Sequence, residues 1–230
     1  MNVYVGTSGW RYPWNEGRSL DWYVEHSGLN AVELNASFYR FPFSSYVKSW
    51  SKKGKGLRWA VKVHRSITHL SRFGDKAYDA WKRLWELFER MDDLVDFYLF
   101  QLPPSFTPDG RDRIEKFVDF TRLGRRFALE WRNKEWFTED NIEWASKLGI
   151  TVVSVSAPKL PEGLINTSGA VYLRMHGREN WYDYEYTEDE LVHFIEEIKR
   201  IKPEEVYVFF NNDEYMLKNA RFVKEQLGGT

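Results

Sequence analysis

The stretch VYLRMH, residues 171–176, alternates apolar and charged side chains and ends in Arg174 and His176. Successive side chains of a β-strand point to opposite faces, so we expect Arg174 and His176 to point to the opposite face from Val171 and Leu173. Strands of a parallel sheet are buried on both faces and are normally apolar throughout, so charges at the end of such a strand need a specific role. The stretch therefore predicts a buried strand whose carboxyl end contributes to a polar site.

Six further stretches run in the same way from apolar residues into a polar or charged group. They are VELN (32–35), VKVH (61–64), LFQ (99–101), LEWR (129–132), VVSVS (152–156) and FFNN (209–212). In barrels of alternating strands and helices, active sites lie at the carboxyl ends of the strands. The repeated pattern therefore predicts where a functional site lies, but it does not identify the reaction.

The order of the predicted elements indicates a barrel. Between the strand candidates lie stretches with helical periodicity, such as 75–91, and capping signals, such as the capping box from Thr187 to Glu190. We predict an α/β fold, a (β/α)8 TIM-barrel-like single compact domain over residues 1–230. An open doubly wound sheet is disfavoured, because GTSGWRY after the first strand lacks the glycine spacing of a dinucleotide-binding turn and no P-loop motif occurs. The eight strand candidates are 3–7, 30–34, 58–64, 95–101, 126–130, 151–155, 170–176 and 205–210.

Composition excludes several classes of function. The chain has no Cys, which removes disulfides, thiolate catalysis and Cys-ligated metal centres. Its 33 basic and 34 acidic residues leave a net charge of −1, so there is no overall positive charge to drive non-specific binding of nucleic acid. With a mean hydropathy of −0.58, no secretion signal and no bilayer-spanning segment, we expect a cytoplasmic protein without membrane contact. Abundant charged residues with only two Gln resemble the composition of proteins from hot environments.

The alternation rule, applied to each strand, predicts which side chains line the barrel mouth. A charge alone in a barrel interior is costly, so most of these groups must pair with one another or contact a ligand. A self-contained structural network of ion pairs is the alternative interpretation. The predicted lining is Glu33, Asn35, Lys62, His64, Gln101, Glu130, Arg132, Ser154, Arg174, His176 and Asn211.

Seven segments in order resemble the YecE-like family, whose domain is known as domain of unknown function 72. They are GTSGWRYPW (6–14), VELNASFYR (32–40), KVHRSITH (62–69), QLPPSF (101–106), EWR (130–132), YLRMHG (172–177) and FFNN (209–212). The resemblance implies a TIM-barrel-type fold without a settled activity, similar in architecture to xylose-isomerase and endonuclease IV barrels. Two segments depart from the family pattern, NEGRSLDW after Trp14 and DEYMLK after Asn212.

The predicted lining suits acid–base chemistry on a small polar or anionic substrate, including phosphorylated or sugar-like ones. Two carboxylates supply an acid and a base, histidine a proton shuttle, and the cations a clamp for a negative group. Lys62 as a Schiff-base former is a subordinate version of this hypothesis. The catalytic candidates are Glu33, Lys62, His64, Glu130 and His176. The substrate-binding candidates are Ser8, Trp10, Tyr12, Asn35, Tyr39, Arg40, Gln101, Arg132, Ser154, Arg174, Asn211 and Asn212.

Two other functions compete with this one. Metal-assisted hydrolysis could use His64, His176 and the two carboxylates, but the neighbouring cations repel a dication, so we predict no cofactor and disfavour a divalent metal. A nucleic-acid-binding or endonuclease IV-like protein is the runner-up. It would stack bases on aromatic residues of the loops over the mouth. Those residues are Trp10, Tyr12, Trp14, Phe38 and Tyr39, with Arg40 as a clamp. The sequence gives no prediction of oligomeric state.

Overall fold

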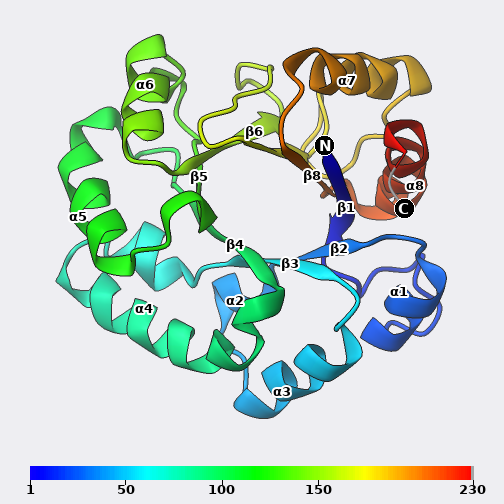
Figure 1. Cartoon of the computed structure of the whole chain (residues 1–230), viewed down its shortest axis with the longest axis horizontal. Helices are drawn as coiled ribbons and strands as arrows, with labels where there is room; N and C mark the ends of the chain where they lie inside the picture. The colour runs from blue at the N-terminus through cyan, green and yellow to red at the C-terminus, as the bar shows by residue number, and fades with distance from the viewer. Residues whose placement is uncertain (229–230) are drawn as a thin grey trace.

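The computed structural model describes residues 1–228 and has a closed barrel of eight parallel strands. Each strand pairs with its neighbours in chain order, and β8 pairs with β1 to close the ring (Figure 1). The predicted fold class is confirmed, and every predicted strand is present with nearly the predicted bounds. The strands are β1 (Asn2–Ser8), β2 (Ala31–Leu34), β3 (Arg58–Lys62), β4 (Val95–Gln101), β5 (Phe127–Glu130), β6 (Thr151–Ser156), β7 (Ala170–Met175) and β8 (Glu205–Phe210).

Helices surround the ring of strands in Figure 1. The α-helices are α1 (Leu20–His26), α2 (Ala36–Tyr39), α3 (Ser44–Lys53), α4 (Asp75–Phe88), α5 (Arg111–Thr121), α6 (Glu139–Lys147), α7 (Glu188–Ile201) and α8 (Met216–Leu227). Short 3-10 helices are η2 (Glu89–Leu94), η3 (Pro108–Gly110), η4 (Gly124–Arg126), η5 (Lys134–Trp136) and η6 (Asp213–Tyr215), and η1 (Ser66–Leu70) is a π-helix. No helix among the described residues has the length and apolar character needed to cross a bilayer.

The capping box predicted for α7 is confirmed. The Thr187 hydroxyl accepts a hydrogen bond from the backbone N–H of Glu190 at 3.3 Å, and the Glu190 carboxylate accepts one from the backbone N–H of Thr187 at 2.9 Å. Two backbone donors that the first turn of a helix cannot pair internally are thereby satisfied. The box fixes the start of α7 and so ends the loop that leaves β7.

The connection from β6 to β7 contains no helix, and this explains how the barrel fits into a short chain. In place of a helix after β6, the irregular segment 157–169 packs beside this strand, and its backbone donors need acceptors. Ser154 supplies one: its hydroxyl accepts from the N–H of Ile165 at 2.8 Å. The prediction that Ser154 faces the barrel interior is therefore wrong, and the inward residues of β6 are Val153 and Val155.

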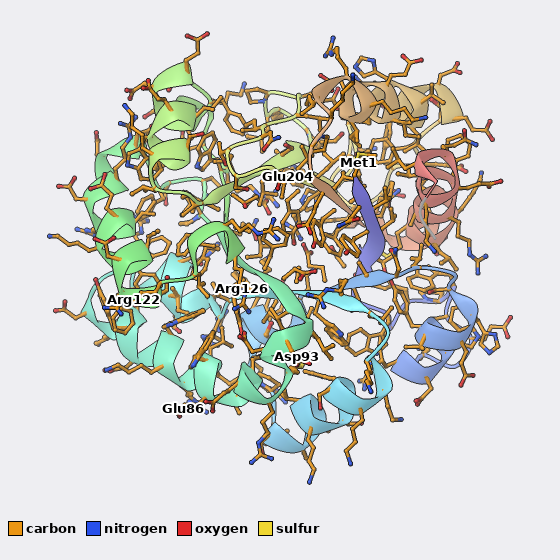
Figure 2. All side chains as sticks on the ribbon, viewed as in Figure 1. Met1, Glu86, Asp93, Arg122, Arg126 and Glu204 are labelled. Atoms are coloured by element: carbon orange, nitrogen blue, oxygen red, sulfur yellow. The ribbon has the colours of Figure 1, made fainter. Side chains whose placement is uncertain are left out.

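Aromatic rings fill the amino-terminal part of the barrel interior. Tyr4 stacks on Tyr207 with ring centroids 4.6 Å apart, and Phe97 meets Tyr207 edge-on at 4.8 Å. Tyr172 lies above them, 5.2 Å from Phe97 and 5.1 Å from Phe209. Side chains crowd the centre of the ring in Figure 2, and these five rings belong to or pack against one interior apolar cluster. This part of the barrel is thus a packed core, which leaves the carboxyl-end mouth as the place for a ligand.

Candidate functional site

Arg174 on β7 is the centre of the charged cluster at the mouth. Its side chain is fully buried and faces inward, as predicted. Its Nε and Nη2 donate to the two oxygens of Glu33 on β2 at 2.9 and 2.6 Å, while Nη1 donates to Glu130 on β5. One guanidinium therefore connects three strands across the barrel and neutralises part of the charge of two buried carboxylates.

Glu33 has hydrogen bonds from every side. Besides the two from Arg174, Glu33 accepts from the Ser8 hydroxyl at 2.5 Å and from the Tyr172 hydroxyl at 2.6 Å. Burial and the adjacent Glu33 carboxylate hold the pKa of Tyr172 well above its usual value, so Tyr172 stays protonated and donates. With both oxygens occupied by four donors, Glu33 has no lone pair directed at a ligand.

Glu130 and Arg132, at the carboxyl end of β5, form the second ion pair of the cluster. Arg132 Nε contacts Glu130 Oε1, and the two side chains are 6% and 0% exposed. Burial alone would raise the pKa of Glu130, but the charges of Arg132, Arg174 and Lys62 outweigh burial and hold this pKa below its usual value. Glu130 is therefore an ionised carboxylate at neutral pH.

His176, which follows β7, is neutral. Burial, with Arg174, Arg132 and Lys62 nearby, holds the pKa of the fully buried imidazole well below 6.5. Arg132 Nη2, an obligate donor, lies 3.1 Å from Nε2, so Nε2 accepts and the ring proton belongs on Nδ1. The side-chain amide of Asn211, 3.1 Å from Nδ1, must then present its oxygen to that proton. The lone pair of His176 is thus already in use.

Lys62, at the end of β3, differs from the other cations of the cluster. The side chain is 8% exposed, and Nζ lies 4.2 Å from the centroid of the Phe38 ring. Among residues 1–228, no carboxylate forms an ion pair with Nζ. Burial and the charge of Arg174 lower the pKa of Lys62 to about 7, although Glu130 and Glu33 oppose them. The environment of Lys62 therefore favours the uncharged amine far more than that of an exposed lysine.

Two residues near the cluster were not among the predicted site residues. His69 lies on the π-helix η1 and meets Phe38 edge-on at 4.9 Å, and burial with the charges of Lys62 and Arg132 lowers its pKa to about 4. Trp181 lies in the loop after β7, and the centroid of its ring is 4.6 Å from the guanidinium carbon of Arg132. Neither follows a strand at the predicted spacing, so the strand-end rule could not find them.

Several predicted residues lie away from the cluster for identifiable reasons. β3 ends at Lys62, so the alternation does not reach His64, which stacks on Phe41 at 4.1 Å and bonds Ser66 at 2.7 Å. Asn212 is buried on the outer side, where its amide donates to the Tyr184 carbonyl and to Asn219, both at 2.8 Å. Asn212 thereby attaches the loop after β7 to α8.

The remaining predicted residues lie at two cavities beside the cluster. One cavity, of about 490 Å³, is lined among others by Gln101, Arg132, Trp181 and Tyr182. The other, of about 520 Å³, is lined among others by Ser8, Trp10, Tyr12, Asn35 and Arg40, while Tyr39 is 68% exposed beside it. The described residues contain no group of three His, Asp or Glu placed to hold a metal ion.

Comparison with known proteins identifies the family. The model of the family "Protein of unknown function DUF72" matches residues 4–230, so the chain belongs to this family, as its motifs predicted. A DUF72 protein of Thermotoga maritima is 30% identical, and its structure superposes with a TM-score of 0.84, covering 99% of this chain and 100% of that one. A DUF72 protein of Enterococcus faecalis is 19% identical, with a TM-score of 0.83 and coverage of 100% and 98%.

More distant solved structures share the fold alone. A D-psicose 3-epimerase, solved in the presence of D-fructose, is 12% identical, has a TM-score of 0.63 and matches over 100% of both chains. No curated protein matches the sequence. The likeness places the chain among TIM-barrel-like proteins, and its chemistry has to be argued from its own residues.

Proposed function

We propose that this protein is an enzyme that binds a small anionic or polar substrate at the barrel mouth and transfers a proton with Lys62 as the base. The observation that carries this proposal is the buried Lys62 amine, which has no carboxylate partner among the described residues and a pKa of about 7. A general base works best when its pKa lies near the working pH. Lys62 meets that condition.

The charges of the cluster support an anionic substrate. The cluster contains three basic side chains, Lys62, Arg132 and Arg174, and two acidic ones, so by formal charge a protonated Lys62 leaves one positive charge in excess. An uncompensated charge in a buried site is costly, and a bound anion removes that cost. Arg132 also lines the cavity of about 490 Å³, which is large enough for a small substrate.

The other titratable groups are poorer bases than Lys62. Both oxygens of Glu33 accept hydrogen bonds, and the pKa of Glu130 is held below its usual value, which weakens Glu130 as a proton acceptor. His176 already accepts from Arg132. We therefore assign proton abstraction to Lys62, and to Glu33 and Glu130 the fixing of Arg174 and Arg132. An uncharged Lys62 amine is also the form that attacks a carbonyl, so covalent chemistry is a variant of the same proposal.

Binding of nucleic acid is the weaker candidate. Trp10 and Phe38, two of the aromatic residues that would stack on bases, are 6% and 9% exposed and pack inside the protein. The net charge of −1 supplies no general attraction for phosphate backbones. Binding with a steep salt dependence would favour nucleic acid over a small substrate.

The proposal is tested by following Lys62 directly. In protein with ¹³C-labelled lysine, the Lys62 signal, identified by its loss in Lys62→Met, should titrate near pH 7. Inorganic phosphate should raise its pKa, because a bound anion stabilises the ammonium form. Small hydroxy acids and sugar phosphates incubated with the protein in D₂O should exchange a carbon-bound proton, and Lys62→Met should abolish that exchange. If none of the anions tested changes the pKa of Lys62, the proposal is wrong.

A further inference from the structure

The cavity of about 520 Å³ lies beside the charged cluster and takes no part in the proton transfer assigned to Lys62. Its floor is formed by the carboxyl ends of β1 and β2, where Ser8 and Asn35 lie, and α3 borders it with Tyr46 and Trp50. Ser8 also donates to Glu33, so one residue of the cavity wall contacts the charged cluster. The cavity therefore adjoins the mouth, where the proposed substrate binds.

Aromatic side chains form most of the walls of this cavity. Trp10 meets Trp50 edge-on at 5.8 Å and Trp59 at 5.9 Å, which fixes the inner wall. Phe43 and Tyr46 form the outer rim, with their rings 5.6 Å apart, and are 62% and 54% exposed. Large aromatic residues gathered at an open cavity expose apolar surface that a flat ligand would cover.

Asn35 provides the polar contact on the floor. Its Oδ1 atom is buried and has no hydrogen-bond partner among the described residues, and although Asn35 is the N-cap residue of α2, its side chain makes no capping hydrogen bond. A buried acceptor without a donor costs free energy, and an N–H or O–H group of a ligand would satisfy it. Asn35 therefore selects a ligand that carries a donor group beside its flat part.

Two arginines set the charge of the ligand. Arg11 and Arg40 line the same cavity, and both are exposed. Neither forms an ion pair with a carboxylate in the part of the chain that the structure describes. Guanidinium groups without acidic partners beside aromatic walls favour a negatively charged, flat molecule.

We infer that the cavity formed by the β1 and β2 ends and α3 binds the aromatic or heteroaromatic ring of a small anionic substrate, with Asn35 accepting a hydrogen bond from it. This inference rests on the proposed function and names its substrate class. The cavity volume lies within the range of single small-molecule sites, which favours one ring-bearing metabolite over a nucleic-acid strand.

The experiment compares phenyl phosphate, which carries a ring, with glycerol 1-phosphate and inorganic phosphate, which do not. Affinities are measured by calorimetry for the wild-type protein and for a Phe43→Ala/Tyr46→Ala variant, whose changes lie at exposed positions. Stacking on two aromatic rings should make phenyl phosphate bind about tenfold more tightly than glycerol 1-phosphate. The double variant should lose that advantage and keep its affinity for inorganic phosphate.

Tyr39→Ala is the matched control, because Tyr39 is exposed nearby but does not line the cavity. It should change none of the affinities. Equal affinities for the three phosphates, with the Lys62 signal still responding to each, would overturn this inference and leave the proposed function intact. Binding of none of them would count against both. Tighter, strongly salt-dependent binding of an oligothymidine that the double variant loses would assign the cavity to nucleic acid instead.

Discussion

Arg174 binds Glu33 through two hydrogen bonds, from Nε to Oε2 at 2.9 Å and from Nη2 to Oε1 at 2.6 Å, and both side chains are fully buried. The third nitrogen of the same guanidinium binds Glu130. Two carboxylates, on β2 and β5, therefore share this one cation, and Glu130 pairs with Arg132 as well. Loss of Arg174 would therefore leave both carboxylates without this shared partner.

Replacing Arg174 by Met should destabilise the protein by about 3–5 kcal/mol, because it leaves two buried carboxylates without their shared partner. Urea denaturation at pH 7 measures the change. Arg200→Met is the control, since the Arg200 side chain is 76% exposed and its removal should cost less than about 1 kcal/mol. Equal stability of the two variants would show that the cluster does not depend on Arg174.

Lys62→Met should stabilise the protein at low pH. The pKa of Lys62 is about 7 in the folded chain, against a usual value of 10.5. Below pH 7 the Lys62 amine is protonated in both the folded and the unfolded chain. Folding then buries a positive charge, and the free-energy cost of that burial is at its largest. Between pH 7 and 10.5 the unfolded chain holds a proton that the folded chain does not, so stability rises with pH and the penalty disappears.

We expect Lys62→Met to raise the free energy of unfolding by about 2–4 kcal/mol at pH 6, since one pKa unit corresponds to about 1.4 kcal/mol. The gain should shrink markedly by pH 9. Urea denaturation at the two pH values gives both numbers. Lys82→Met, at a side chain that is 61% exposed, should behave alike at pH 6 and 9. A gain that does not change with pH would contradict the assigned pKa.

Tyr172→Phe removes the hydroxyl that donates to Glu33 at 2.6 Å while keeping the ring in the aromatic core. The loss of one donor to a buried carboxylate should cost about 1–3 kcal/mol of unfolding free energy. Thermal and urea unfolding can both detect it. Tyr39→Phe makes the same chemical change at a position that is 68% exposed, and it should leave stability within about 0.5 kcal/mol of wild type. If both variants unfold alike, the Tyr172 hydroxyl is not essential to the network.

The sequence predicts the strands and most of the inward charges because the period of a strand is two and the outward face must be apolar. Glu33, Lys62, Glu130 and Arg174 all lie where that rule places them. The sequence could not show which of them pair, because Arg174 reaches Glu33 from a strand 141 residues away and only barrel closure brings them together. His69 was missed because a π-helix, not a strand end, brings it to the mouth.

The rule fails at Ser154 for a reason that can itself be tested. No helix follows β6, and the outward-facing Ser154 bonds the backbone of the irregular segment 157–169 instead. Ser154→Ala should leave the Ile165 N–H without an acceptor and cost about 1–3 kcal/mol of unfolding free energy. Because Ser154 faces away from the mouth, the same variant should bind phosphate with wild-type affinity and leave the Lys62 titration unchanged. Ser45→Ala, at an exposed position of α3, controls for the loss of a hydroxyl. If the Ser154→Ala variant had normal stability but bound phosphate more weakly, Ser154 would belong to the binding site at the mouth.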